Sequence, residues 1–215
     1  MDTARTRSAR HGWLLWFLLL NVLLAGVSLA TDPIVREAAF DRLPPGATVD
    51  DKAVLGTMLD QELVLRVAFL PVRTFVGWGL FALCLYYMAV AFRPPAPVRL
   101  AQMFALEVRS ESALVLGAVV GAVRQGLAPA RFSGAPPWSI LELTGTGGGL
   151  GTDALLGALN PFALLYLALL ISGVGLVCGF GRVRSALVVL GVWVTTTVLN
   201  AGALVALRDL LQLGV

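Results

Sequence analysis

Long apolar runs separated by short polar segments make up this chain of 215 residues. A helix needs roughly 20 apolar residues to cross about 30 Å of hydrocarbon. Five runs approach that length, although Arg124 and Gln125 interrupt the third. We therefore expect an all-α polytopic membrane protein with one membrane domain, residues 1–215. Its five transmembrane helices are predicted over residues 13–30, 74–92, 112–130, 161–180 and 185–207.

The predicted external segment, residues 31–73, contains an amphipathic pattern of its own. Apolar residues recur there at helical spacing, namely Val54, Leu55, Met58, Leu59, Leu63 and Val67. Asp50 or Asp51 can cap such a helix, and Pro71 can end or kink it. The sequence thus adds an external amphipathic helix to the five spans. Its apolar face is covered either by the outer leaflet or a partner, or by the other external loop, residues 131–160.

Arginines mark one side of the membrane. Short loops rich in Arg and Lys remain cytoplasmic, and three such segments fall on the same side of a five-span protein. They contain Arg5, Arg7 and Arg10, then Arg93, Arg99 and Arg109, and finally Arg182 and Arg184. The last pair also marks a tight turn between the fourth and fifth spans. We expect a cytoplasmic N-terminus and an external C-terminus.

Residues 1–30 also resemble a signal peptide, with a basic start, an apolar stretch and "SLA" before Thr31. The apolar stretch is longer than the roughly 7 to 15 residues that are usual in a signal peptide. We expect this segment to be retained as an uncleaved first span.

The composition agrees with a membrane setting. Hydrophobic residues make up 58% of the chain and charged residues 13%, against about a quarter charged in soluble domains. The net charge of +3 is small and dispersed, so we expect no nucleic-acid partner. Cys84 and Cys178 lie inside apolar runs, where a thiol behaves as a small hydrophobe.

Residues suited to catalysis or metal binding are scarce. The single histidine, His11, lies in the N-terminal tail, which excludes a histidine zinc site or a Ser–His pair inside the membrane. Glu107 and Glu111 are four apart and share a helix face, a spacing that suits metal binding or proton transfer. Arg109 is adjacent and no third ligand accompanies them, so we expect a solvated cytoplasmic interface and no cofactor.

A glycine run, "LTGTGGGLGTD", precedes the fourth span. It lacks the G-x-G-x-x-G spacing of a dinucleotide-binding turn and the lysine of a phosphate loop. We expect a flexible linker.

Few polar residues fall within the predicted spans. An ionisable residue in a span is a functional candidate, which singles out Arg124. It lies near the external end of its span, where it can snorkel or pair with Glu142 or Asp153, with a substrate contact as the alternative. Asn200 and the threonines before it are more often helix–helix hydrogen-bonding groups than pore-lining groups.

Small residues suggest where helices pack closely. Glycines spaced four apart let another backbone approach, as in the pairs Gly117/Gly121 and Gly175/Gly179, and Gly173 adds to the second of these packing faces. The neighbour is either another helix of this chain or another subunit. Asn160 is a natural N-cap for the fourth span, with Pro161 as its first helical residue.

The last third of the chain, "LNPFALLYLALLISGVGLVCGFGRVRSALVVLGVWVTTTVLNA", resembles the end of the Yip domain family of Ypt-interacting-protein-like membrane proteins. The matching features are Asn160-Pro161-Phe162, the span glycines, the basic turn before Ser185 and Ala186, and Trp193. The resemblance implies an all-helical, non-enzymatic membrane protein. Eukaryotic members work with small GTPases, and some bacterial members accompany export systems made of an ABC transporter and a periplasmic adaptor.

These observations favour a non-catalytic assembly or regulatory subunit of a larger membrane complex. The expected partners are the lipid bilayer and other membrane subunits, in a bacterial inner membrane, because the short tail leaves no cytosolic domain to hold a GTPase. One alternative is a small-molecule or ion transporter that uses Arg124, Gln125, Asn200 and the threonines. An intramembrane enzyme has the least support from the residues present.

Overall fold

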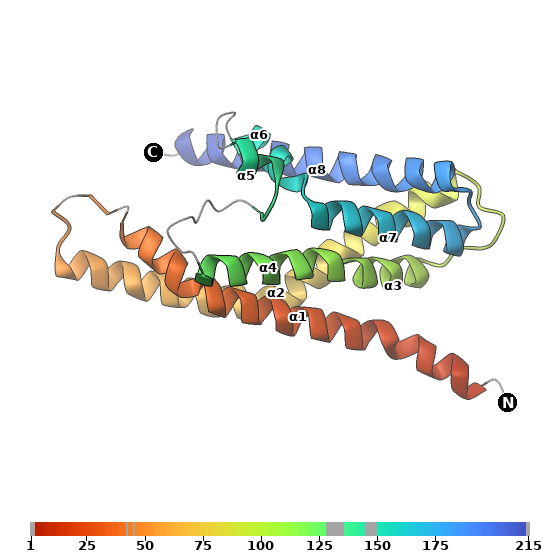
Figure 1. The fold of residues 1–215 in the computed structure, drawn as a ribbon, viewed down its shortest axis with the longest axis horizontal. Helices are drawn as coiled ribbons and strands as arrows, with labels where there is room; N and C mark the ends of the chain where they lie inside the picture. The colour runs from red at the N-terminus through yellow and green to blue at the C-terminus, as the bar shows by residue number, and fades with distance from the viewer. Residues whose placement is uncertain (1–2, 42, 45, 128–135, 145–149, 214–215) are drawn as a thin grey trace.

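A computed structural model describes residues 3–41, 43–44, 46–127, 136–144 and 150–213. Within these ranges all regular secondary structure is helical, as the sequence predicts. The helices lie roughly along the long axis of the molecule (Figure 1).

The first two helices form a long hairpin. Helix α1 spans Thr3–Phe40 and α2 spans Val49–Ala91, with their connecting turn at the end of the molecule far from the N-terminus (Figure 1). Thr48 caps α2, because its Oγ1 accepts a hydrogen bond from Asp51 N–H at 3.2 Å. In return Asp51 Oδ2 accepts one from Thr48 N–H at 2.8 Å. The cap is therefore Thr48, and the predicted cap at Asp50 or Asp51 is wrong.

The predicted amphipathic helix and the second span belong to one continuous helix. Pro71, expected to end or kink it, lies inside α2. Contacts with α1 hold α2 on both sides of this proline. On one side Arg36 pairs with Asp60, and on the other Thr74 Oγ1 donates to Asn21 Oδ1 at 2.7 Å. These tertiary contacts support the helix across the proline.

The third and fourth helices form a nearly continuous rod. Helix α3 spans Leu100–Ser110 and α4 spans Ser112–Leu127. Glu111 between them keeps a right-handed helical backbone, and its N–H donates to the Glu107 carbonyl at 2.9 Å. The predicted third span, residues 112–130, starts at the middle of this rod. Residues 100–127 rise about 40 Å at 1.5 Å per residue, whereas α4 alone is 16 residues long.

Two short helices precede the last hairpin. They are α5, Ile140–Thr144, and α6, Leu150–Ala158. Residues 145–149 of the predicted linker lie outside the described residues. The linker prediction is wrong from Leu150 onward, because α6 begins there, and Asp153 lies in its first turn, where the helix dipole favours a negative charge.

The last two helices are α7, Pro161–Cys178, and α8, Arg182–Leu213. Asn160 caps α7, since its Oδ1 accepts a hydrogen bond from Ala163 N–H at 2.9 Å. At the other end Gly179 adopts φ +68°, a left-handed conformation that favours glycine.

The turn between α7 and α8 is made by residues 179–181. The tight turn that Arg182 and Arg184 are predicted to mark is present, and both arginines directly follow it, in the first turn of α8. Gly179 ends α7 early enough for the chain to reverse before the arginines, and Arg184 then lies over the Phe180 ring, 5.4 Å from its centroid.

The main hydrophobic core lies where α2, α3, α7 and α8 meet. Its fully buried members are Ala82, Leu85, Ala89, Met103, Leu170, Val174, Cys178, Val188 and Val189. A smaller core joins α1 to α2 and to the α3–α4 rod. It contains Phe17, Leu20, Trp78, Val108 and Val115.

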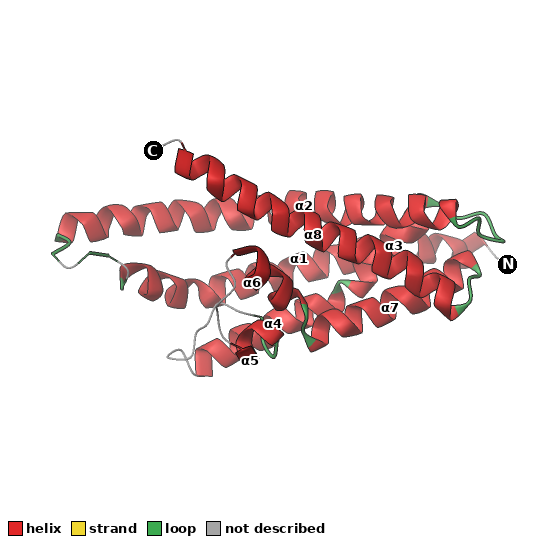
Figure 2. Ribbon diagram, turned by 90° about the horizontal axis from the view of Figure 1, so that it is seen from above, coloured by secondary structure: helices red, strands yellow, loops and turns green. Residues whose placement is uncertain are grey.

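Four arginines lie at one end of the bundle. Figures 1 and 2 place the N-terminus, the α2–α3 loop and the α7–α8 turn at one end, and the α1–α2 turn at the other. Arg93, Arg99, Arg182 and Arg184 therefore share an end, as the predicted topology requires. Four stretches in the described helices are long and apolar enough to cross a membrane: Gly12–Phe40, Val49–Ala91, Pro161–Cys178 and Arg182–Ala203.

Candidate functional site

A buried polar cluster of Glu107, Glu111 and Tyr166 lies inside the bundle. Glu107 lies in the last turn of α3, Glu111 links α3 to α4, and Tyr166 comes from α7. Tyr166 Oη donates a hydrogen bond to Glu107 Oε1 at 2.8 Å. Glu107 is only 1% exposed, and Glu111 is partly buried. Because Glu111 follows Glu107 by four helical residues, the two carboxyl groups come within hydrogen-bonding reach.

The surroundings of this cluster are apolar. Tyr166 belongs to the main core, and the Phe81 ring of α2 lies 6.1 Å from its ring. Glu107 Oε2 is buried and accepts no hydrogen bond from any donor in the described residues. The ion pairs found in that part of the chain include neither Glu107 nor Glu111. Arg109 is exposed and reaches toward Gly12 of α1 instead.

The expectation of a solvated interface at these two carboxylates is wrong for Glu107. A sequence signal for its burial does exist. Buried or half-buried positions follow the rod at alternating spacings of four and three, namely Met103, Glu107, Ser110, Leu114, Gly117 and Gly121. Glu107 and Ser110 thus occupy core positions of one continuous helical stripe.

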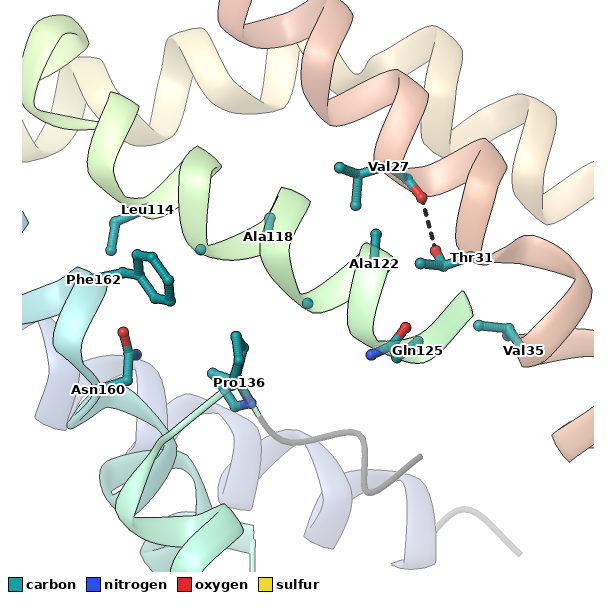
Figure 3. A pocket seen from close by; sticks show the side chains of 13 residues that line it. Val27, Thr31, Val35, Leu114, Ala118, Ala122, Gln125, Pro136, Asn160 and Phe162 are labelled. Carbon is teal, nitrogen blue, oxygen red and sulfur yellow. Dashed lines mark hydrogen bonds between the residues drawn. The ribbon is translucent and has the colours of Figure 1, made fainter. Parts of the chain in front are cut away.

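A pocket of about 460 Å³ opens between α1, α4 and the start of α7 (Figure 3). Four of the six α4 residues on its wall are small: Gly117, Ala118, Gly121 and Ala122. Three polar side chains line it, of which two are already hydrogen-bonded: the Thr31 hydroxyl donates to the Val27 carbonyl at 2.9 Å, and the Asn160 amide binds Ala163 N–H and the Gly157 carbonyl. Gln125 is the third. The pocket can hold a small apolar group, with few polar contacts to orient it.

Arg124 pairs with Glu142 of α5. Its two terminal nitrogens lie 2.9 and 3.2 Å from the two carboxylate oxygens, a bidentate geometry. The guanidinium also lies 5.2 Å from the centroid of the Trp138 ring. Arg124 lowers the pKa of Glu142 below its ordinary value through this hydrogen bond, and Trp138 N–H lowers it further. Of the partners considered for Arg124, the structure selects Glu142.

The glycines singled out in the sequence meet side chains or backbone of the same chain. A Cβ on Gly117 would lie 2.8 Å from the Phe162 ring, and one on Gly173 would overlap Leu106 Cδ1. Gly121 faces Pro137, Gly175 faces Ser185, and Gly179 is the α7 cap. Of the two neighbours considered for these glycines, another helix of this chain or another subunit, the contacts within the described residues support the first.

Polar residues of α8 make local hydrogen bonds. Thr195 Oγ1 donates to the Gly191 carbonyl at 2.8 Å, and Thr196 Oγ1 donates to the Val192 carbonyl at 3.0 Å. Asn200 is exposed. A groove of about 410 Å³ between α2 and α8 includes both threonines and Cys84. The hydroxyls already bond to their own helix, which leaves them little capacity to line a polar path.

Comparison with known protein families, curated proteins and solved structures finds no match for this chain. In the described residues the fold is all-helical, with four candidate membrane-spanning helices, and Glu107 is buried inside the bundle beside the partly buried Glu111. Among the described residues, no group of three or more His, Cys, Asp or Glu side chains is placed to hold a metal ion.

Proposed function

We propose that this chain is a non-catalytic assembly or regulatory subunit of a larger complex in a bacterial inner membrane. In this proposal it crosses the bilayer five times, through α1, α2, the α3–α4 rod, α7 and α8. The N-terminus and the arginine-rich end are cytoplasmic, and the C-terminus is external. The shared location of the basic loops at one end supports this orientation.

The observation that carries the proposal is an exposed apolar stripe on the α1–α2 hairpin. Helix α2 has 43 residues, so at 1.5 Å per residue it is about 64 Å long, roughly twice the hydrocarbon thickness of a bilayer. Its charged residues all precede Thr74. The charged N-terminal half is therefore the part that leaves the membrane.

This projecting half keeps apolar side chains in solvent. One outward face carries five of them at helical spacing, each more than half exposed: Val54, Met58, Leu65, Phe69 and Val72. Apolar surface left in water costs about 25 cal/mol for each Å². A stripe of this spacing matches a helix that docks against a groove or another helix of a partner.

The Yip domain resemblance suggests which complex to test first. Some bacterial members of that family accompany ABC-type export systems. A periplasmic hairpin next to such an exporter can contact its external parts.

Purification in a mild detergent, followed by native mass spectrometry, tests the proposal. The wild-type chain should retain a stoichiometric membrane-protein partner. Met58→Glu and Leu65→Glu should lose it, because each places a charge on the stripe. Thr57→Glu is the matched control, since Thr57 is exposed on the same helix beside the stripe, and it should retain the partner.

Two results contradict the proposal. The first is a wild-type chain that is monodisperse and alone after gentle extraction from its native membrane. The second is equal loss of the partner in Thr57→Glu and Leu65→Glu, since binding would then not depend on the stripe.

A further inference from the structure

The Glu107–Glu111–Tyr166 cluster lies deep within the proposed membrane region. Helix α3 starts at Leu100, next to the arginine-rich loop. At 1.5 Å per residue, Glu107 is about 10 Å and Glu111 about 16 Å along the rod from that end. Both therefore fall well inside a hydrocarbon layer about 30 Å thick.

The cluster has too few hydrogen-bond donors for two ionised carboxylates. Tyr166 supplies one donor, to Glu107 Oε1. Glu107 Oε2 has no donor within the described part of the chain, and the group within its reach is the carboxyl of Glu111. Two carboxylates are both acceptors, so a hydrogen bond between them requires that one carries a proton.

No positive charge compensates the pair among the residues that the structure describes. From α2 the core presents Phe81, Ala82 and Leu85, none of which ionises. From α7 the only titratable group facing the pair, among the described residues, is Tyr166. Arg109 lies two residues from Glu107, on the opposite side of α3, and reaches toward α1. An uncompensated buried carboxylate is costly, which favours its protonated form.

We propose that Glu107, Glu111 and Tyr166 form an intramembrane site that binds an exchangeable proton. The proton lies between the two carboxyl groups, and Tyr166 holds Glu107 in place by its hydrogen bond. Of the two carboxyl groups, Glu111 is the less enclosed by the protein, since it is partly exposed and Glu107 is not. Loss of the proton adds a second negative charge between α3 and α7, so the two carboxylates repel each other and the packing of the helices weakens. The site does not depend on the proposed partner.

Infrared difference spectroscopy of the full chain in lipid nanodiscs tests this site. The wild type should show the carbonyl band of a protonated carboxylic acid at neutral pH, shifted in heavy water and lost at alkaline pH. The band should vanish in the Glu107→Gln/Glu111→Gln double variant and change frequency in Tyr166→Phe. Glu142→Gln is the control, since its carboxyl group is ion-paired outside the cluster, and it should keep the band.

The pH dependence of stability gives a second readout. A carboxyl pair that did not bind and release a proton would leave the unfolding temperature independent of pH. The unfolding temperature of the wild type should fall as pH rises and the band disappears, and Glu107→Gln should lose this dependence. Absence of the band in the wild type overturns the proposal, and so does its persistence in the double variant. If the double variant does not fold, an unchanged band frequency in Tyr166→Phe also overturns it.

Discussion

Gly117→Ala should separate α4 from α7. An added Cβ would lie 2.8 Å from both Cγ and Cδ2 of Phe162 and 3.0 Å from its Cβ. Rotation of the Phe162 side chain about its Cα–Cβ bond can relieve the first two contacts. It cannot move Cβ, which is fixed to the backbone of α7 next to the Asn160 cap. The helices must therefore shift, and such overpacking costs about 1–3 kcal/mol.

A matched glycine isolates this steric cost. Alanine is favoured over glycine in a helix by roughly 0.5–1 kcal/mol, so Gly117→Ala combines a gain with a larger loss. Gly77 lies in α2, and an added Cβ there would have no neighbouring atom within 4 Å. Gly77→Ala should therefore show the gain alone. The difference between the two variants should be about 1–3 kcal/mol.

Reversible unfolding in mixed micelles, followed by tryptophan fluorescence, measures both variants. The cost of Gly117→Ala should shrink in a Phe162→Ala background, because two of the three close atoms are then absent. Equal stabilities of the Gly117 and Gly77 variants would refute the close contact of α4 with α7.

Three further predictions concern other parts of the molecule. Acidification should weaken the Arg124–Glu142 contact, because Arg124 lowers the pKa of Glu142 in the folded protein. The ion pair therefore stabilises the fold above the pKa that Glu142 has in the unfolded chain. This stabilisation is lost as the pH falls through the lower pKa of the folded state. Glu142→Gln should remove this acid-side dependence from unfolding curves. Arg36→Ala should widen the α1–α2 hairpin, because it removes the ion pair with Asp60, and spin-label distances across the hairpin measure the change. A maleimide should label Cys84, which is exposed, before Cys178, which is buried, as mass spectrometry of the detergent-solubilised protein will show.

Local signals predicted the helical class and the start of α7. Asn160 and Pro161 act within one helical turn, so their roles depend only on neighbouring residues. The long apolar runs likewise appear as long apolar helices. In each case the cause lies within a short stretch of chain.

Two features depended on residues far away in sequence. Pro71 is a local signal for the end of a helix, yet α2 continues because α1 contacts it on both sides through Arg36 and Asn21. Glu107 carries a charge that normally favours water, yet Tyr166, 59 residues later, bonds it inside the core. Neither partner can be identified from spacing alone, since each comes from a different helix.

The stripe on α2 and the carboxyl cluster can be separated experimentally because they lie on different elements. Leu65→Glu should remove the partner and leave the infrared band of the cluster unchanged. Glu107→Gln should change that band and leave the partner bound. If each variant changes both readouts, the two sites are coupled. The α3–α4 rod is then the physical link between them, because it contacts α7 at the cluster and also contacts α1 of the hairpin. Reciprocal effects on partner affinity and proton binding would then be required by linkage.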